Sequence, residues 1–229
     1  MNGTDAAGTG ATTDLVGITE PLRERFAVRH DAREVALSGS RDAIRSAANA
    51  IRAIHRRELD GADGLIDDAR AALERATDAC APHPELMHAG FVTDAAKEVA
   101  EAVLTRAAVS GEALPAPGEV GVDDVAWLHG LAETVGELRR ACLDHVRHGA
   151  LEEGERLLGL MQDILSALAT IDAPDGLTRG LRRAADGARA ITERTRGDLT
   201  TAAGQRDLKQ ALDAHRVTLE TVLAEGEGR

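Results

Sequence analysis

The sequence predicts an all-α fold, built as a single-domain bundle of about six to seven helices. Three observations lead to this prediction. Ala, Leu, Arg and Glu dominate the 229 residues, and these residue types favour helices. Only 1% of the residues are aromatic, and the β-branched runs bounded by turns that are typical of strands are missing. Apolar residues recur at three- and four-residue steps along most of the chain, which is the period of a helix with one buried face.

The chain divides into a short tail and one domain. Residues 1–17 are small, polar and rich in Gly and Thr, so we expect a disordered N-terminal tail there. Residues 18–225 carry the periodic pattern and form the helical domain, which is long enough to bury a sizeable core.

The first helix opens near Thr19, with Pro21 in its first turn, and extends to about Glu58. We expect one interruption at residues 38–40, where Gly39 lies between two serines. Four arginines of this helix fall within a sector of about 60°. They are Arg41, Arg45, Arg52 and Arg56. Guanidinium groups bind phosphate oxygens in a bidentate way, so this arginine stripe is a candidate for nucleic-acid binding. Pairing with acidic residues of adjacent helices explains the same spacing equally well.

Two further helices follow. Residues 60–64 contain two Asp and two Gly and predict a break, after which a second helix extends from Leu65 to about Ala81 and ends before two prolines. The third helix covers Phe91 to about Ser110. Its apolar stripe consists of Val92, Ala96, Val99 and Val103. The polar residues Asp94, Glu98, Glu101 and Thr105 are expected on the opposite side.

A Gly- and Pro-containing linker, residues 111–121, leads to a fourth helix that contains Trp127 and ends near His148. Its core stripe consists of Leu128, Leu131, Val135, Leu138 and Cys142. Opposite that stripe we expect Glu133, Glu137, Arg140 and Asp144. A broadly apolar helix then covers residues 151–171, a turn covers 172–176, and the last two helices are expected at residues 177–198 and 211–224.

Two helices thus each carry a pair of glutamates away from their own core stripe. Carboxylate oxygens are the ligands that Mg²⁺ prefers, so four glutamates brought together could hold a catalytic cation. The alternative is a solvated face on which neighbouring charges pair along one helix, as Glu137 and Arg140 would.

The charge balance and the cysteines bear on the environment of the protein. The formal net charge is −12, and Lys97 and Lys209 are the only lysines, a composition that resembles halophilic proteins adapted to molar salt. Cys80 and Cys142 are too few for a disulfide framework and predict buried thiols in a reducing, cytoplasmic compartment. No apolar run is long enough to span a membrane, so no membrane partner is expected. No phosphate-binding loop, zinc-ligand spacing or nucleophile elbow is present.

Three sequence blocks resemble the translin family, and within it the translin-associated factor X branch and its archaeal relatives. Residues 128–140, Leu-His-Gly-Leu-Ala-Glu-Thr-Val-Gly-Glu-Leu-Arg-Arg, are similar to the family's Leu-Leu-Gly-x-Ala-Asp-x-x-Gly-Glu-Leu-Met-Arg block. Residues 97–102, Lys-Glu-Val-Ala-Glu-Ala, resemble its Gln-Glu-Tyr-Val-Glu-Ala block. Residues 40–42 and 51–56 resemble its Ser-Arg-Asp and Leu-His-Arg elements. The resemblance covers roughly residues 22 to 200.

This resemblance implies a helical subunit of a homo-oligomeric, octamer-like shell that binds single-stranded RNA or DNA. The factor X branch further implies an endoribonuclease that depends on Mg²⁺ or Mn²⁺. The sequence does not distinguish between these two cations. By position, the catalytic carboxylates and metal ligands are Glu98, Glu101 and Glu133, with Glu137 as a supporting ligand. Glu133 stands where the family usually has aspartate, which affects coordination more than fold. Two alternatives stay open: a nucleic-acid-binding shell without cleavage, and a purely structural helical oligomer.

Overall fold

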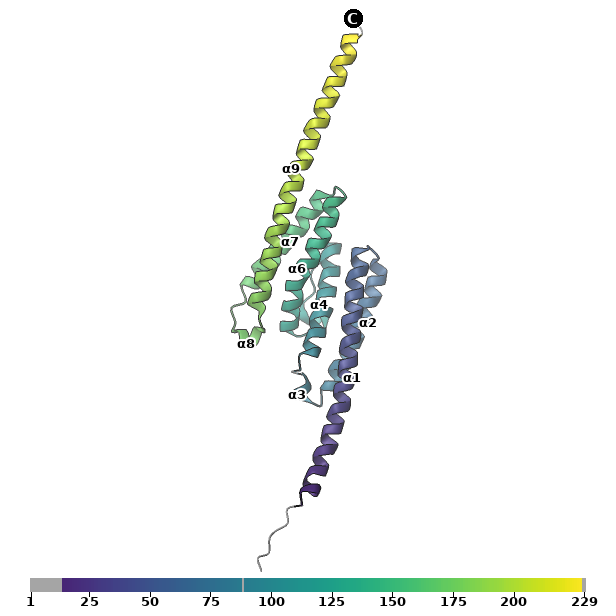
Figure 1. Ribbon diagram of the computed structural model, residues 1–229, viewed down its shortest axis with the longest axis vertical. Coiled ribbons are helices and arrows are strands. Elements are labelled where there is room, and N and C mark those ends of the chain that lie inside the picture. The colour runs from purple at the N-terminus through teal and green to yellow at the C-terminus, as the bar shows by residue number, and fades with distance from the viewer. Residues whose placement is uncertain (1–13, 88, 228–229) are drawn as a thin grey trace, which may run out of the picture.

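The computed structural model describes residues 14–87 and 89–227, and within them every element of regular structure is a helix. These described residues form six long helices and three single-turn helices (Figure 1). The long helices are α1 (Leu15–His55), α2 (Leu59–Cys80), α4 (Phe91–Ser110), α6 (Asp124–Arg147), α7 (Leu151–Ala169) and α9 (Leu181–Glu227). The single turns are α3 (Pro84–Met87), α5 (Pro117–Val120) and α8 (Asp175–Thr178). The predicted all-α fold is therefore confirmed.

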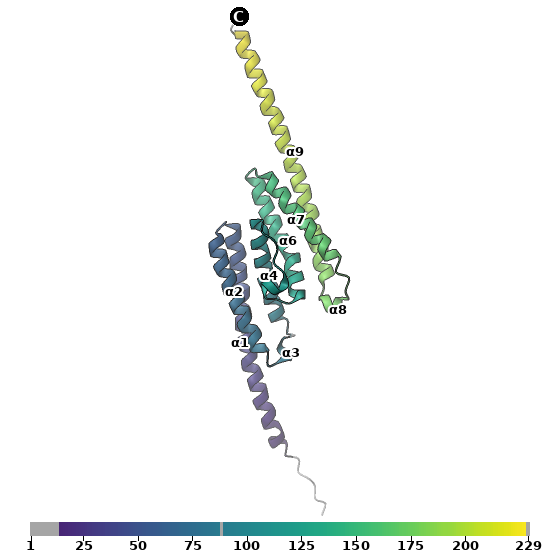
Figure 2. The same ribbon diagram turned by 180° about the vertical axis from the view of Figure 1, so that it is seen from behind.

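The helices pack side by side, with α4 and α6 in the middle of the bundle (Figures 1 and 2). On one side α4 contacts α1 and α2, which form an antiparallel pair; on the other side α6 contacts α7 and α9. The largest fully buried apolar side chains come from five of these helices: Ile54, Leu104, Leu138, Leu157, Met161 and Leu199. No helix among the described residues is long and apolar enough to cross a membrane.

The two predicted core stripes on α4 and α6 are buried or packed against the core. The opposite side of α4 differs from the expectation, because Glu101 is only 9% exposed and Thr105 is fully buried. The reason is that α4 is covered by α1, α2 and α6, so little of its circumference faces solvent. A glutamate on this helix is therefore held inside the bundle.

The first helix is longer and more regular than the sequence predicts. It begins at Leu15, where the Asp14 carboxylate accepts a hydrogen bond from the Gly17 N–H at 2.9 Å, so the boundary at residue 18 is too late. Residues 1–13 of the predicted tail lie outside the described residues. The expected interruption at residues 38–40 is wrong. Gly39 is helical and buried, and a Cβ there would lie 2.9 Å from the Ala72 carbonyl oxygen of α2. Glycine at this position permits close helix packing instead of ending the helix.

Two other predicted breaks are also wrong. Residues 60–64 belong to α2, since Ala62 packs in a small apolar cluster against Ala53 and Ile54 of α1. The expected gap at residues 199–210 is part of α9, which is continuous from residue 181 to residue 227. Leu199 is fully buried in this stretch and holds it against the bundle. At residues 60–64 tertiary packing overrides the weak helix propensity of glycine and aspartate, whereas in α9 packing reaches only to Ala203 and the helix continues beyond it exposed.

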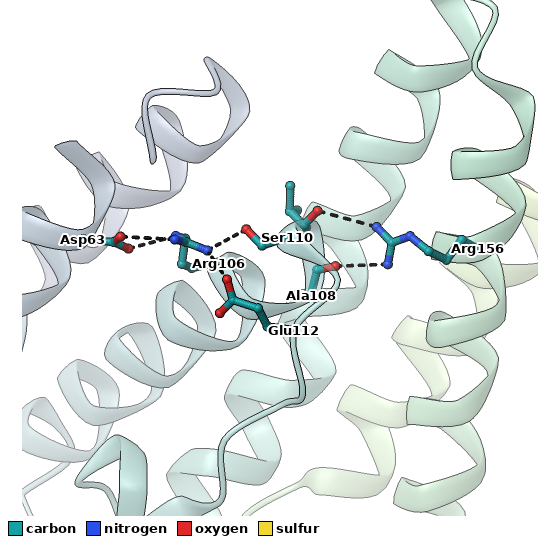
Figure 3. Close-up of polar contacts among 7 residues, drawn as sticks. Asp63, Arg106, Ala108, Ser110, Glu112 and Arg156 are labelled. Atoms are coloured by element: carbon teal, nitrogen blue, oxygen red, sulfur yellow. Dashed lines mark hydrogen bonds and ion pairs between the residues drawn. The ribbon is translucent and has the colours of Figure 1, made fainter. Parts of the chain in front are cut away.

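Two arginines fix the C-terminal end of α4 (Figure 3). Arg106 forms a two-pronged ion pair with Asp63 of α2 at 2.8 and 3.1 Å, and also binds Ser110 and Glu112. Arg156 of α7 donates to the carbonyl oxygen of Ala108 at 3.3 Å and to that of Val109 at 3.5 Å. A cation at this end of a helix satisfies carbonyls that have no partner within the helix. Helix α4 is thus anchored to neighbours on both sides.

Gly130 sets the distance between α4 and α6. A Cβ at this position would lie 2.7 Å from the Ala100 Cβ and 3.0 Å from both the Glu101 nitrogen and the Lys97 oxygen. These contacts are too short for any side chain, so only glycine allows the two backbones to approach this closely. The absence of a side chain at residue 130 therefore determines how near Glu133, one turn further along α6, comes to α4.

We predict that Gly130→Ala lowers the free energy of unfolding by about 1–3 kcal/mol, because the added methyl group forces α4 and α6 apart. Gly136→Ala is the matched control: it lies on the same helix, and no atom lies within 4 Å of the position that its methyl group would take. This control should raise the free energy of unfolding by about 0.5–1 kcal/mol, because alanine favours a helix. Urea denaturation of both variants checks the pair. Equal effects would contradict the close contact at Gly130.

Candidate metal centre and nucleic-acid surface

Three glutamates meet where α4 crosses α6. Glu98 and Glu101 are one turn apart on α4, and Glu133 comes from α6. One carboxylate oxygen of each lies within 4.8 Å of the others, and we call these three residues the acidic cluster. The sequence predicts all three as metal ligands, and the structure brings them together. Glu133 is the most accessible of the three, with 40% of its side chain exposed.

Glu101 is the buried member of the acidic cluster. Burial, together with the negative charges of Glu133, Glu98 and Glu137, raises the pKa of its carboxyl group from 4.5 to about 8. The nearby Lys97 opposes this shift without cancelling it. The Glu101 carboxyl makes no side-chain hydrogen bond among the described residues. A carboxylate at this position therefore lacks compensation that a further positive charge would supply.

Lys97 places a positive charge against the acidic cluster. Its ammonium nitrogen donates to Glu133 Oε1 at 2.9 Å and lies 3.4 Å from Glu98 Oε1. Burial by itself lowers the pKa of Lys97, but the hydrogen bond to Glu133 and the charges of both glutamates raise it overall. Lys97 is thus a charged counter-ion that bridges α4 and α6.

Glu137, predicted as a supporting ligand, is held elsewhere. Its Oε2 lies 2.5 Å from His55 Nε2 of α1, and the histidine side chain is only 4% exposed. The hydrogen bond from His55 lowers the pKa of Glu137, with smaller contributions from the charges of His55 and Arg140. Glu137 is close enough to raise the pKa of Glu101, but it is not one of the three clustered carboxylates. The expected Glu137–Arg140 pairing gives way to this contact between helices.

The four arginines of the predicted stripe all lie on the exposed side of α1. Three of them contact residues close by in sequence: Arg45 binds Asp42, Arg52 binds Asn49, and Arg56 binds Glu58 through two bonds of 3.0 and 2.7 Å. No side-chain bond from Arg41 is found among the described residues. The alternative interpretation expects these arginines to pair with acidic residues of adjacent helices. Within the described chain, none of the four does so. Exposed local pairs of this kind are weak and leave the guanidinium groups available.

The arginine stripe borders the acidic side of the bundle. By the 100° rotation per helical residue, the four arginines lie about 40–100° around α1 from His55, which reaches Glu137. A phosphate backbone bound along this part of α1 would therefore pass close to the α1–α6 contact. Arg52 and Arg56 lie within one turn of His55, so this end of the stripe is the part nearest to the acidic cluster, whereas Arg41 lies about 21 Å further along α1.

The acidic cluster fits a hard divalent cation. All three donors are carboxylate oxygens, and Glu101 is buried without a hydrogen-bonding partner among the described residues. In an octahedral Mg²⁺ site adjacent ligands lie about 3 Å apart and opposite ones about 4.2 Å apart, so the three oxygens, which lie within 4.8 Å of one another, have to move closer together to bind one ion. Glu98 and Glu133 are partly exposed, so their side chains have room to rotate toward such an ion. The chemistry of the donor set thus agrees with the predicted cation.

Two residues of this region have no role in the sequence prediction. Lys97 and His55 both occur in the quoted blocks, but their partners lie 36 and 82 residues away. Lys97 carries a detectable signal, because it is one of only two lysines and directly precedes a predicted ligand. His55 carries no such signal, apart from its place in the element that resembles the family's Leu-His-Arg.

The raised pKa of Glu101 predicts a pH-dependent stability in the absence of metal. Between pH 4.5 and about 8 the unfolded chain has lost the Glu101 proton while the folded chain keeps it, so stability falls as pH rises and the loss is complete above about 8. Glu101→Gln should therefore exceed the wild type in free energy of unfolding by about 1–3 kcal/mol at pH 9, and by much less at pH 5. Denaturant titrations with chelator measure this. A stability difference between the variant and the wild type that does not change with pH would refute the raised pKa of Glu101.

Three solved structures share this arrangement of helices, and one further protein is similar in sequence. No family model matches the chain. An uncharacterized protein of Methanocaldococcus jannaschii is 29% identical over 197 residues, which are 85% of this chain and 86% of that protein. The C3PO of Archaeoglobus, solved in a complex with duplex RNA, is 32% identical with a TM-score of 0.76 and covers 82% of this chain and 98% of its own. A crystal structure of the same Archaeoglobus protein is 31% identical, with a TM-score of 0.75 and the same coverage of both chains.

The apo C3PO of Nematostella covers 84% of this chain and all of its own with a TM-score of 0.74, but at 16% identity this likeness concerns the fold alone. The Archaeoglobus structures combine similarity of fold and of sequence over nearly their whole length. With its bundle of six long helices and the matching residue blocks on α1, α4 and α6, this chain belongs to the translin family, in the group that resembles translin-associated factor X.

Proposed function

We propose that this protein binds RNA and hydrolyses its phosphodiester bonds with a divalent cation, Mg²⁺ or Mn²⁺, held by Glu98, Glu101 and Glu133. The observation that carries the proposal is the convergence of these three carboxylates within 4.8 Å at the α4–α6 crossing. When bound, such a cation neutralises charge on a scissile phosphate and acidifies water. The protein's own part is to position the ligands, to admit the substrate and to control the local charge.

Each residue has a distinct part in this proposal. Glu101 is the buried ligand. A bound cation would supply the positive charge that its carboxylate lacks, so Glu101 would bind the cation in its deprotonated form. Glu98 and Glu133 are the accessible ligands, and the exposed side of Glu133 is where a phosphate can approach. Glu137 acts through His55 as a positioning pair that connects α6 to α1. The glutamate at position 133 retains the carboxylate of the family's usual aspartate on a side chain one methylene longer.

The arginine stripe is the proposed binding surface for the nucleic acid. Its guanidinium groups are exposed and can contact phosphates in a bidentate way. The structure of Archaeoglobus C3PO in complex with duplex RNA supports RNA as a ligand of this fold. Single-stranded RNA or DNA is the expected ligand of the present protein, and with 1% aromatic residues base stacking contributes little, so sequence preference should be slight. A homo-oligomeric shell would present several such surfaces together.

One observation favours the alternative of a nucleic-acid-binding protein without cleavage. Lys97 already supplies a positive charge to Glu98 and Glu133, and it stands where the resembling block has glutamine. A permanent counter-ion competes with a cation for the same oxygens, so metal binding must displace it or accommodate it. Whether catalysis survives therefore depends on how strongly Lys97 holds the acidic cluster.

We expect the wild type to cleave an end-labelled single-stranded RNA in Mn²⁺ or Mg²⁺ and not in chelator. Glu98→Gln/Glu101→Gln should lower the cleavage rate by at least about 100-fold, because removing both charges abolishes cation binding, while RNA affinity stays unchanged. The matched control is Glu152→Gln/Glu155→Gln, which changes two exposed glutamates with the same spacing on α7. A duplex RNA of the same sequence is tested in parallel.

Binding and cleavage can be separated by a second variant. Arg41→Gln/Arg45→Gln should weaken RNA binding and reduce the slope of affinity against salt by about two, because two phosphate contacts are lost. RNA binding by the wild type without any metal-dependent cleavage would establish the non-catalytic alternative. Absence of both binding and cleavage would leave only the structural oligomer.

Lys97→Gln should bind Mn²⁺ about 10- to 100-fold more tightly than the wild type, since it removes a positive charge that contacts two of the three ligands. Isothermal titration calorimetry measures this affinity directly. Lys209→Gln, the only other lysine, removes the same charge from an exposed position on α9 and should leave the affinity unchanged. Equal affinities in wild type and Lys97→Gln would show that Lys97 does not shield the acidic cluster.

A further inference from the structure

Helix α9 continues far beyond the bundle. Its last fully buried side chain is Leu199, and every residue from 204 to 221 is exposed. We call residues 205–227 the α9 extension. Figures 1 and 2 both show it projecting into solvent at the end of the molecule opposite the N-terminal half of α1. The last ion pair that ties it to the bundle joins Arg206 to Glu152 of α7 at 4.0 Å.

The α9 extension carries a stripe of leucines against which no other described residue of the chain is packed. Leu208, Leu212, Leu219 and Leu223 are 49–66% exposed and fall within a sector of about 60°. A single helix of about 20 residues is marginally stable in water, and an amphipathic helix is normally stabilised by packing of its apolar face. A projecting helix with one such stripe therefore needs a partner to bury it.

The spacing of the leucines identifies that partner. The intervals along the stripe are four, seven and four residues, so the pattern reads the same in both directions. A helix of this kind can pair with an identical antiparallel helix about a two-fold axis between residues 215 and 216. Leu208 then faces Leu223 of the second copy, and Leu212 faces Leu219. We propose that the α9 extensions of two copies of this chain form an antiparallel coiled coil.

The charges beside the leucine stripe favour the antiparallel direction. Lys209 and Glu220 lie on the same flank, about 40–120° around the helix from the leucines. In an antiparallel pair this flank of one helix faces the same flank of the other, and Lys209 lies within about two residues of Glu220 of the second copy. In a parallel pair this flank would face the opposite flank of the second copy, so Lys209 and Glu220 would not meet. Arg216, next to the axis, has Glu220 of its own helix at 3.8 Å, which reduces repulsion between the copies.

This contact is independent of the proposed catalysis. The α9 extension lies outside the bundle, whereas the acidic cluster and the arginine stripe lie on α1, α4 and α6. Pairing through the extensions joins two complete bundles by a rod and leaves both surfaces free. It therefore adds a connection between separate particles, whether single subunits or whole shells, that the bundle itself does not supply.

Engineered disulfides distinguish the directions of pairing. Cys80 and Cys142 are buried, and burial raises the pKa of both thiols, that of Cys142 to about 11, so neither should interfere. Under mild oxidation, Leu208→Cys/Leu223→Cys should form a covalent dimer on a non-reducing gel. Each single variant should stay a monomer on that gel, because residue 208 faces residue 223 and not itself. Cross-linking by either single variant would overturn the antiparallel arrangement.

The assembly state provides the second measurement. Leu212→Asp/Leu219→Asp should lower the mass of the particle measured by light scattering, because it places charges inside the leucine stripe and breaks the contact between extensions. Val217→Asp is the matched control: Val217 is equally exposed but lies on the opposite side of the helix, so the mass should not change. RNA binding and cleavage should be the same in both variants, which separates this inference from the proposed function.

Two results would overturn self-pairing. An unchanged mass for Leu212→Asp/Leu219→Asp would show that the leucine stripe has no partner of its own kind. The second result combines two observations: Leu22→Asp/Phe26→Asp causes the same loss of mass, and the double-cysteine variant forms no cross-link. The leucine stripe would then bind the exposed apolar residues at the start of α1 in another copy.

Discussion

The close contact of α4 with α6 at Gly130 is the constraint on which the rest of the site depends. It brings two helices together at a distance that no side chain permits, and it thereby places Glu133 against Glu98 and Glu101. Three carboxylates in a partly buried space repel one another, so the surrounding structure has to compensate. Lys97 does so for the accessible pair, and protonation does so for Glu101. The arginine anchors at the end of α4 hold the helix in this position.

The surface and the interior of the protein differ in how their charges are used. On α1 the arginines make short, local contacts that are easily exchanged for a phosphate. At the α4–α6 crossing and the neighbouring α1–α6 contact the charges pair with residues of other helices and are partly buried. A protein with a net charge of −12 can therefore still offer a basic strip to a nucleic acid, because the strip is defined by neighbouring residues and not by the total charge.

Much of this structure could be predicted from the sequence, for reasons that differ between its parts. The core stripes of α4 and α6 were predictable because burial of one helix face imposes a period, and the three clustered glutamates followed from their positions within resembling blocks. The helix boundaries were not. Gly39 and the residues 60–64 look like breaks locally, yet they are helical because α1 and α2 pack against each other there. The partners of Lys97 and His55 could not be predicted either, since no local pattern reports which helices cross.

The His55–Glu137 bond has a consequence for the order in which the chain folds. It joins residues 82 positions apart, whereas the α1–α2 hairpin needs only short-range contacts. Closing so long a loop costs entropy that is recovered only after α4 and α6 have docked on α1. The contact that fixes the arginine stripe of α1 relative to the acidic cluster is therefore among the last features to form. A nascent or partly folded chain contains the helices without the assembled site.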